Sequence, residues 1–211
     1  MYQVAVLLSG TGSNLQALFE AEDAGQLGAQ VSLVVSDQAT AYGLQRALQR
    51  GVATAHVPLP AAPRGPQRAM VRAAWEQRLA GVTAAFTPDL VVLAGFMRIL
   101  SPAFLNWFPQ RVINQHPALL PDDSSDTVTT STGLVIPALR GAHVVDEAVQ
   151  RRLPVSGCTI HRVTPRVDDG PVLARAEVPL RPDDTPASLH ERIKVEERRL
   201  IVEVVRSLAQ R

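Results

Sequence analysis

The sequence has little cysteine, little net charge and almost no lysine, and each shortage narrows the possible functions. Its one cysteine, Cys158, allows no disulfide within the chain, which fits a reducing cytoplasm. The formal net charge of +1 disfavours strong attraction to nucleic acid or an anionic membrane, although it leaves room for a local basic pocket that holds a small anion. Lys194 is the only lysine, a bias typical of genome composition or thermal adaptation. We expect a cytoplasmic protein with small-molecule substrates and no nucleic-acid or membrane partner.

Long hydrophobic runs are also absent. The first residues, MYQVAVLLSG, carry no basic leader, and their apolar run is too short to span a membrane, so we expect them to form a first strand. No spacing among the histidines and Cys158 matches a zinc site, and we expect no metal. With 211 residues, 46% of them hydrophobic, the chain can bury the core of a single domain, residues 1–211. Monomer and homodimer both remain open.

Apolar runs of strand length alternate with segments of helical spacing. Near-continuous apolar runs predict buried strands at Val4–Leu8, Val31–Val35, Leu90–Ala94 and Val112–Asn114. Helical spacing covers Asn14–Ala24, Thr40–Arg50 and Gly65–Leu79. This alternation predicts an α/β domain with a mostly parallel sheet. Further along, Cys158–Val163 and Val172–Val178 predict an added antiparallel pair, and a closing helix begins at about Pro186.

A glycine-containing segment, Ser9-Gly10-Thr11-Gly12-Ser13-Asn14, follows the first predicted strand and opens a helix. Glycines let the backbone approach an anion, and the amides of a helix N-terminus carry partial positive charge. Ser13 and Asn14 also suit an N-cap. The segment resembles a dinucleotide fingerprint but has Leu15 in place of the third glycine, and Asp37 is the nearest acid for a ribose. A phosphate site is favoured over a simple tight turn, and both over a dinucleotide site.

A second candidate lies where another buried strand ends, at Leu93-Ala94-Gly95-Phe96-Met97-Arg98-Ile99-Leu100. Ligands bind outside such carboxyl ends in open parallel sheets. Backbone groups after Gly95 could bind a flat heterocycle, with Met97 and Ile99 packed on it. Periodicity alone favours ordinary core packing of Met97, Ile99 and Leu100.

The third candidate is Asn114-Gln115-His116-Pro117, joined with Asp168-Asp169-Gly170 further along the chain. Asn114 can hold a carbonyl oxygen, His116 can protonate the oxyanion that forms, and Asp168 can keep that histidine charged near neutral pH. Asn114 and His116 would face the same side if the strand continued that far, and Pro117 favours extended backbone at His116. A structural hydrogen bond of His116 is an equally favoured reading.

Three other polar residues have both a structural and a functional reading. His143 and His161 are further candidates for a polar pocket. Glu197 interrupts the apolar stripe of the closing helix and therefore needs a partner, because an unpaired buried charge is costly. That partner is either an arginine or the hydroxyls of a substrate, with Lys194 nearby for an anion, and the residues alone favour the arginine.

Taken together, four strings make the chain resemble the folate-dependent phosphoribosylglycinamide formyltransferase family, in the family's order. These strings are Leu8–Gln16, Leu93–Leu100, Asn114–Pro121 and Val167–Pro171. The resemblance implies a Rossmann-like sheet with helices on both faces. It also implies transfer of a formyl group from 10-formyltetrahydrofolate to the amine of phosphoribosylglycinamide in purine biosynthesis.

The resemblance also assigns roles to residues. It implies that His116 is the proton donor and that Asp168 raises the pKa of His116. It places the substrate phosphate at Gly12, Ser13 and Asn14, and Lys194 and Glu197 near the phosphoribosyl group. It places the folate at Arg72, Met97, Arg98, Ile99, Leu100 and Asn114.

One segment departs from the family pattern. After Leu119-Leu120-Pro121 the family runs shortly into an aromatic-Pro-Gly segment and a histidine, whereas here residues 122–139 intervene before Gly141-Ala142-His143. The polar part, Asp122–Gly133, predicts a surface loop or flap beside the active site, with a solvated spacer as the alternative. It could serve as a lid, an interface element or a neutral loop.

Two relatives share the Asn, His and Asp set. Methionyl-tRNA formyltransferase needs an additional C-terminal domain, and this chain ends soon after Asp168 with a single helix. Formyltetrahydrofolate deformylase usually has an N-terminal regulatory domain and a second histidine where this chain has Pro117. The remaining alternative is a non-catalytic nucleotide-binding domain, which would not need His116 or Asp168.

Overall fold

The computed structural model describes residues 1–61 and 64–210, and the chain divides into two compact units. Unit 1 contains Met1–Ile113 and the end of the chain from Arg206, and unit 2 contains Asn114–Val205. The boundary therefore falls inside strand β5 (Val112–His116) and again inside helix α6 (Pro186–Ala209).

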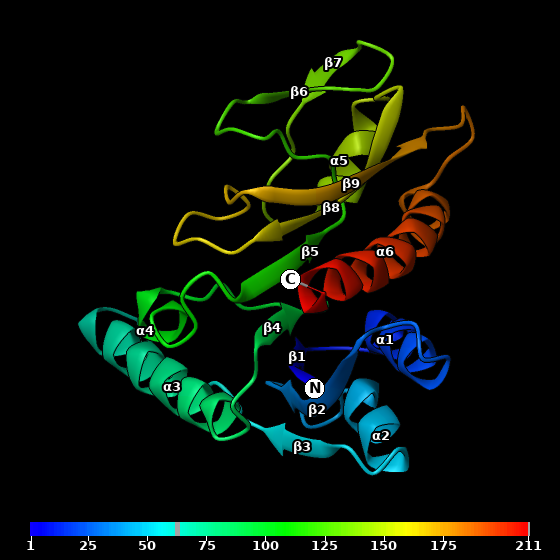
Figure 1. Ribbon diagram of the computed structural model, residues 1–211. Coiled ribbons are helices and arrows are strands. Elements are labelled where there is room, and N and C mark those ends of the chain that lie inside the picture. Colours follow the sequence, from blue (N-terminus) through cyan, green and yellow to red (C-terminus); the bar gives the residue numbers. More distant parts are fainter. Residues whose placement is uncertain (62–63, 211) are drawn as a thin grey trace. The chain divides into compact units, whose positions relative to one another are not determined.

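Unit 1 alternates strands and helices. Its strands are β1 (Tyr2–Leu8), β2 (Ala29–Ser36), β3 (Ala53–His56) and β4 (Leu90–Leu93). They pair in parallel in the order β3-β2-β1-β4. Its helices are α1 (Ser13–Asp23), α2 (Tyr42–Gln49), α3 (Pro66–Ala84) and α4 (Pro102–Leu105). Parallel strands need crossover connections, and these helices provide cover on both sides of the strands, α1 and α2 on one side and α3 and α4 on the other (Figure 1).

The core of unit 1 is built around β1. Residues Val4–Leu8 are fully buried, as expected for a strand with neighbours on both edges and helices on both faces. Burial of each such aliphatic side chain stabilises the fold by about 1.5–3 kcal/mol. A buried β1 fixes the position of the loop that follows it, Ser9–Gly12.

Unit 2 contains the other elements of the sheet and a separate hairpin. Strands β8 (Val155–Arg162) and β9 (Val172–Pro179) pair antiparallel, and β5, β8 and β9 are neighbours in that order. Strands β6 (Thr127–Thr129) and β7 (Val135–Pro137) form their own two-stranded antiparallel sheet (Figure 1). Helix α5 (Val144–Gln150) precedes β8, and α6 follows β9. The predicted antiparallel pair and closing helix are thus confirmed.

The segment Asp122–Gly133 lies mostly at the surface, as predicted, but it is not a plain loop. Strand β6 lies within this range and pairs with β7, so the polar segment is half of a hairpin. Val128 and Ile136 are buried in one cluster with Leu119 and Val155. Two buried aliphatic side chains, one on each short strand, are enough to attach the hairpin to the core of unit 2.

Candidate active site

Strand β5 carries two of the predicted site residues. It continues to His116, so Asn114 and His116 project from the same face, as expected for residues two apart in a strand. Asn114 is half-buried and His116 is 3% exposed. Pro117, directly after His116, disfavours helical backbone at the histidine and helps to hold it extended.

His116 and Asp168 lie next to each other, although 52 positions separate them. His116 Nδ1 is 3.4 Å from Asp168 Oδ2, and both side chains are buried. On the other side of the ring, His116 Nε2 donates a hydrogen bond to the Leu139 carbonyl oxygen at 2.8 Å. The Asp168 carboxylate accepts a second bond from the Gly141 backbone N–H at 2.8 Å. The structure therefore brings together the predicted histidine and carboxylate.

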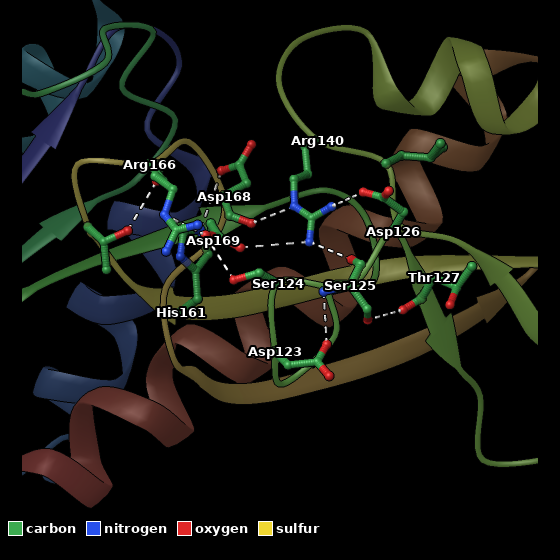
Figure 2. Close-up of polar contacts among 12 residues, drawn as sticks. Asp123, Ser124, Ser125, Asp126, Thr127, Arg140, His161, Arg166, Asp168 and Asp169 are labelled. Carbon is green, nitrogen blue, oxygen red and sulfur yellow. Dashed lines mark hydrogen bonds and ion pairs between the residues drawn. The ribbon is translucent and has the colours of Figure 1, made fainter.

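His161 on β8 connects this pair to Asn114. Its Nε2 is 3.2 Å from Asn114 Nδ2 and 3.5 Å from Asp168 Oδ1, and its Nδ1 donates to the Arg162 carbonyl oxygen at 2.9 Å. Figure 2 shows His161 beside Asp168. The prediction of His161 as a pocket residue is confirmed. The same prediction for His143 is wrong, because that side chain is 88% exposed at the start of α5 and faces Asp146.

Burial affects the pKa values of both His116 and Asp168. Burial lowers the pKa of His116 below its ordinary value of 6.5, and the charge of Asp168 and the Leu139 carbonyl oppose this only in part. Asp168 acts to raise the pKa of His116, as expected, but burial outweighs this effect, so the net shift does not favour a charged His116 near neutral pH. Burial alone would raise the pKa of Asp168, but bonding by His161, the charge of His116 and the Gly141 N–H hold it below its ordinary value.

Glu197 is another buried polar side chain near β5. It lies on the buried side of α6, is 3% exposed and accepts a hydrogen bond from Gln115 Nε2. Gln115 lies between Asn114 and His116 in β5, so this hydrogen bond connects Glu197 to the strand that carries the site residues. Lys194, one turn earlier, forms an ion pair with Glu191 at 2.7 Å. Burial and the charge of Glu197 raise the pKa of the Cys158 thiol to about 12, so that cysteine is no nucleophile.

The phosphate-loop candidate lies in unit 1 and depends on one glycine. Gly12 is the N-cap of α1 with a φ of 71°, and a Cβ there would lie 2.8 Å from the Gly43 Cα, so both conformation and space require glycine. The prediction that Ser13 or Asn14 caps the helix is wrong, because both lie inside α1 and no side chain caps the N-terminus. An uncapped first turn is the arrangement that an anion can complete.

An open cavity of about 530 Å³ lies beside this loop. Its lining comes from this loop, from the segment between β2 and α2 with the first residue of α2, and from the segment after β4: Ser9, Gly10, Thr11, Gln38, Thr40, Ala41, Tyr42 and Met97. Asp37, the acid considered for a ribose, is buried, and its carboxylate accepts bonds from Ser9 Oγ at 2.6 Å and Arg98 Nε at 2.7 Å. These bonds argue against the dinucleotide reading.

The structure brings together several residues of the predicted folate set, also in unit 1. Arg72 donates to the Ile99 carbonyl oxygen and lies 3.1 Å from the buried Glu76 carboxylate. Met97 and Ile99 are 76% and 60% exposed, so the core-packing reading is wrong for both. That reading holds for Leu100, which is buried.

A comparison with protein families identifies the family of this chain. The model of the formyl transferase family matches residues 2–205, a range that includes parts of both units. The chain belongs to the formyl transferase family. It is a formyl-transferring enzyme, as the four strings of the sequence predicted.

Individual relatives place this formyl transferase near one branch of the family. A phosphoribosylglycinamide formyltransferase of Mycobacterium tuberculosis is 39% identical over 98% of this chain and 85% of its own length. The Escherichia coli protein of that name is 36% identical over 92% of this chain and 81% of its own. The crystal structure of glycinamide ribonucleotide transformylase 1 from Symbiobacterium toebii superposes with a TM-score of 0.85, at 37% identity, over 100% of this chain and 88% of that one. This superposition confirms the predicted Rossmann-like fold.

Three contacts of this formyl transferase have no counterpart in the predictions. They are the Leu139 carbonyl, the Arg140 side chain and the Gly141 N–H, which adjoin His116 or Asp168. The only signal was the return of the family pattern at Gly141 after the intervening segment. Among residues 1–61 and 64–210, no helix is long and apolar enough to cross a membrane, and no cluster of three His, Cys, Asp or Glu side chains suits a metal ion.

Proposed function

We propose that this formyl transferase moves the formyl group of 10-formyltetrahydrofolate to the amine of 5′-phosphoribosylglycinamide, a step of purine biosynthesis. The observation that carries the proposal is the arrangement of the half-buried Asn114 with the buried His116 and Asp168 at one end of β5, within a chain of this family. The names of its relatives in Mycobacterium tuberculosis and Escherichia coli support the same substrate.

The chemistry of formyl transfer suits these three residues. The acceptor amine attacks the formyl carbon, a new C–N bond forms, and charge develops on the formyl oxygen. The Asn114 amide lies 3.2 Å from His161 Nε2, and an amide N–H can donate to this oxyanion. Protonated His116 supplies the proton, and Asp168 stabilises the imidazolium. When the intermediate collapses, the formyl oxygen returns its proton to His116, the bond to the folate nitrogen breaks, and that nitrogen takes up the proton that the amine loses.

The binding roles belong to the same proposal. The backbone at Gly12, Ser13 and Asn14 binds the phosphate, which the uncapped start of α1 supports. Lys194 and Glu197 contact the phosphoribosyl group. Arg72, Arg98 and Asn114 hold the folate with Leu100, Met97 and Ile99, and the exposure of the last two supports contact with a flat ring.

The organisation of the chain is also part of the proposal. We propose one formyl transferase domain, residues 1–211, because the family model extends over both compact units. Residues 122–139 are an insertion into it, which the separate two-stranded sheet of β6 and β7 supports. Its place in purine biosynthesis fits the expected cytoplasmic location, with the enzyme as a monomer or a homodimer.

The proposal is tested by supplying the purified enzyme with 10-formyltetrahydrofolate in the presence and absence of phosphoribosylglycinamide. The expected result is tetrahydrofolate and N-formyl product in equal amounts, and only with the acceptor present. Folate consumption without the acceptor would identify a deformylase instead. No consumption, together with binding of phosphoribosylglycinamide that persists in His116→Ala, would support the non-catalytic alternative.

A further inference from the structure

Asp168 has a backbone conformation that needs support from its surroundings. Its φ of 50° lies in the left-handed region, which residues other than glycine rarely adopt. The residue belongs to the turn between β8 and β9, and its carboxylate direction depends on this unusual backbone. Something in unit 2 must therefore hold the backbone of Asp168, since the more common conformations would aim the carboxylate elsewhere.

The Arg140 guanidinium makes that contact. Its Nε donates to the Asp168 carbonyl oxygen at 3.1 Å, and its second nitrogen, Nη2, donates to the Ser125 carbonyl oxygen at 2.8 Å. Nη2 also lies 3.9 Å from the Asp169 carboxylate, which is 9% exposed. Figure 2 shows Arg140 between the Asp168–Asp169 turn and the segment that leads into β6. A planar guanidinium has several donors in a fixed fork, so one side chain can fix both segments at once.

The residues on either side of Arg140 contact the same pair. Leu139 accepts the hydrogen bond from His116 Nε2, and the Gly141 N–H donates to the Asp168 carboxylate. Three consecutive residues, the last of the insertion and the two that follow it, thus hold the histidine, the aspartate backbone and the aspartate side chain. A shift of Arg140 would be transmitted to all three contacts.

We propose that Arg140 is a positioning residue for formyl transfer, which orients the Asp168 carboxylate toward His116 and links the 122–139 hairpin to this pair. The inference rests on the proposed function of His116 and Asp168. It gives the insertion a role in the alignment of the catalytic groups. Neither a lid nor a neutral loop accounts for these bonds to the aspartate backbone.

The test compares two arginine-to-lysine variants. Arg140→Lys keeps the charge but loses the fork that reaches two carbonyl oxygens. Arg175→Lys is the matched control, because Arg175 also binds a backbone carbonyl, that of Leu120, and an aspartate of the insertion, Asp122, but it does not contact Asp168. The two arginine side chains are 22% and 27% exposed. Each variant is measured for kcat, for KM of both substrates and for thermal stability.

Arg140→Lys should lower kcat on the order of 10- to 100-fold with KM little changed, since small misplacements of catalytic groups have effects of that size. Arg175→Lys should retain the kcat of the wild type even where its stability falls. Equal values of kcat in the two variants would overturn the proposal, because the loss would then reflect anchoring of the hairpin alone.

A second measurement does not depend on turnover. The pKa of His116 is followed by NMR in the protein without substrates, with its signals assigned from a His116→Gln variant. Burial lowers the pKa of this ring, Asp168 and the Leu139 carbonyl raise it, and the charges of His161 and Arg140 lower it. Lysine keeps the charge of Arg140, so a change in the pKa of His116 would report the position of Asp168. Release of Asp168 should therefore lower the pKa of His116 in Arg140→Lys and leave it unchanged in Arg175→Lys. If the pKa of His116 is the same in Arg140→Lys as in the wild type, the proposal is overturned. If Arg140→Lys shows the expected shift but the wild type transfers no formyl group, only the proposed function is overturned.

Discussion

His116 is surrounded by acceptors and shielded from water, and these two conditions act on its charge in opposite directions. A carbonyl oxygen and a carboxylate face its two ring nitrogens, which favours the imidazolium. Burial disfavours any charge and outweighs them, so the pKa of His116 is lowered. A general acid with a lowered pKa gives up its proton readily, and the cost is that a smaller fraction is protonated at neutral pH.

The first prediction concerns the histidine itself. His116→Ala should lower kcat about 10²- to 10⁴-fold, the usual contribution of a general acid, while the fold survives. The control is His143→Ala, because that histidine is exposed and does not contact the pair. Turnover of both purified variants is measured beside their circular dichroism spectra. Near-normal turnover of a folded His116→Ala protein would rule out the proposed role.

The second prediction concerns pH. Asp168 acts to raise the pKa of His116, so Asp168→Asn should lower that pKa further and reduce the protonated fraction at every pH. We expect kcat to fall by orders of magnitude and the alkaline decline of the remaining kcat/KM to move to lower pH. Asp146→Asn, which changes an exposed aspartate beside His143, should leave the profile in place. If the alkaline decline of kcat/KM in Asp168→Asn stays at the same pH, or moves to higher pH, Asp168 does not act on His116 as proposed.

At the scale of elements, long apolar runs were predictable and short elements were not. Val4–Leu8 and Val31–Val35 lie in strands β1 and β2 because continuous burial on both faces leaves a clear apolar run. Strand β3 has four residues and none is fully buried, so its sequence carries no such run. The hairpin was missed for the same reason, since each of its strands has three residues and one buried side chain.

The sequence could predict those parts of the candidate site that consist of side chains, but not those that consist of backbone groups. Asn114 and His116 stand two apart at a strand end, which a sequence can indicate. Their approach to Asp168 was a hypothesis from the chemistry of the three side chains, which the family resemblance supported, because no local pattern brings together residues so far apart. The contributions of Leu139 and Gly141 come from backbone groups, which every residue type carries, so their only signal in the sequence is the return of the family pattern at Gly141.

The third prediction tests whether the hairpin is part of the core of unit 2. Val128 is 2% exposed and Val135 is 65% exposed, so one substitution can be compared at two positions. Val128→Ala should lower the free energy of unfolding by about 2 kcal/mol, from two buried methyl groups and the cavity that they leave. Val135→Ala should change it by less than about 0.5 kcal/mol. Both values come from urea denaturation, and equal effects would mean that the hairpin does not pack as described.

At the scale of the whole molecule, buried histidines and aspartates together set how stability depends on pH. Burial lowers the pKa of His116, and burial followed by the charge of Lys194 lowers that of His190. The unfolded chain therefore takes up protons at these positions first, near the ordinary value of 6.5, and stability is lost as pH falls from there toward the folded-state values. The lowered pKa values of Asp37 and Asp168 act in the same direction but in a lower window, below their ordinary value of 3.8.

The fourth prediction follows because the histidines act at higher pH than the aspartates. Between about pH 8 and about pH 5 the free energy of unfolding should fall as the solution is acidified, before any aspartate is protonated. In His116→Gln this fall should be smaller, because glutamine takes up no proton in either state, while His190 keeps part of it. Urea denaturation at several pH values measures the slope directly. A slope that is unchanged in His116→Gln would mean that His116 binds protons equally in the folded and unfolded chain, which is incompatible with its burial beside Leu139 and Asp168.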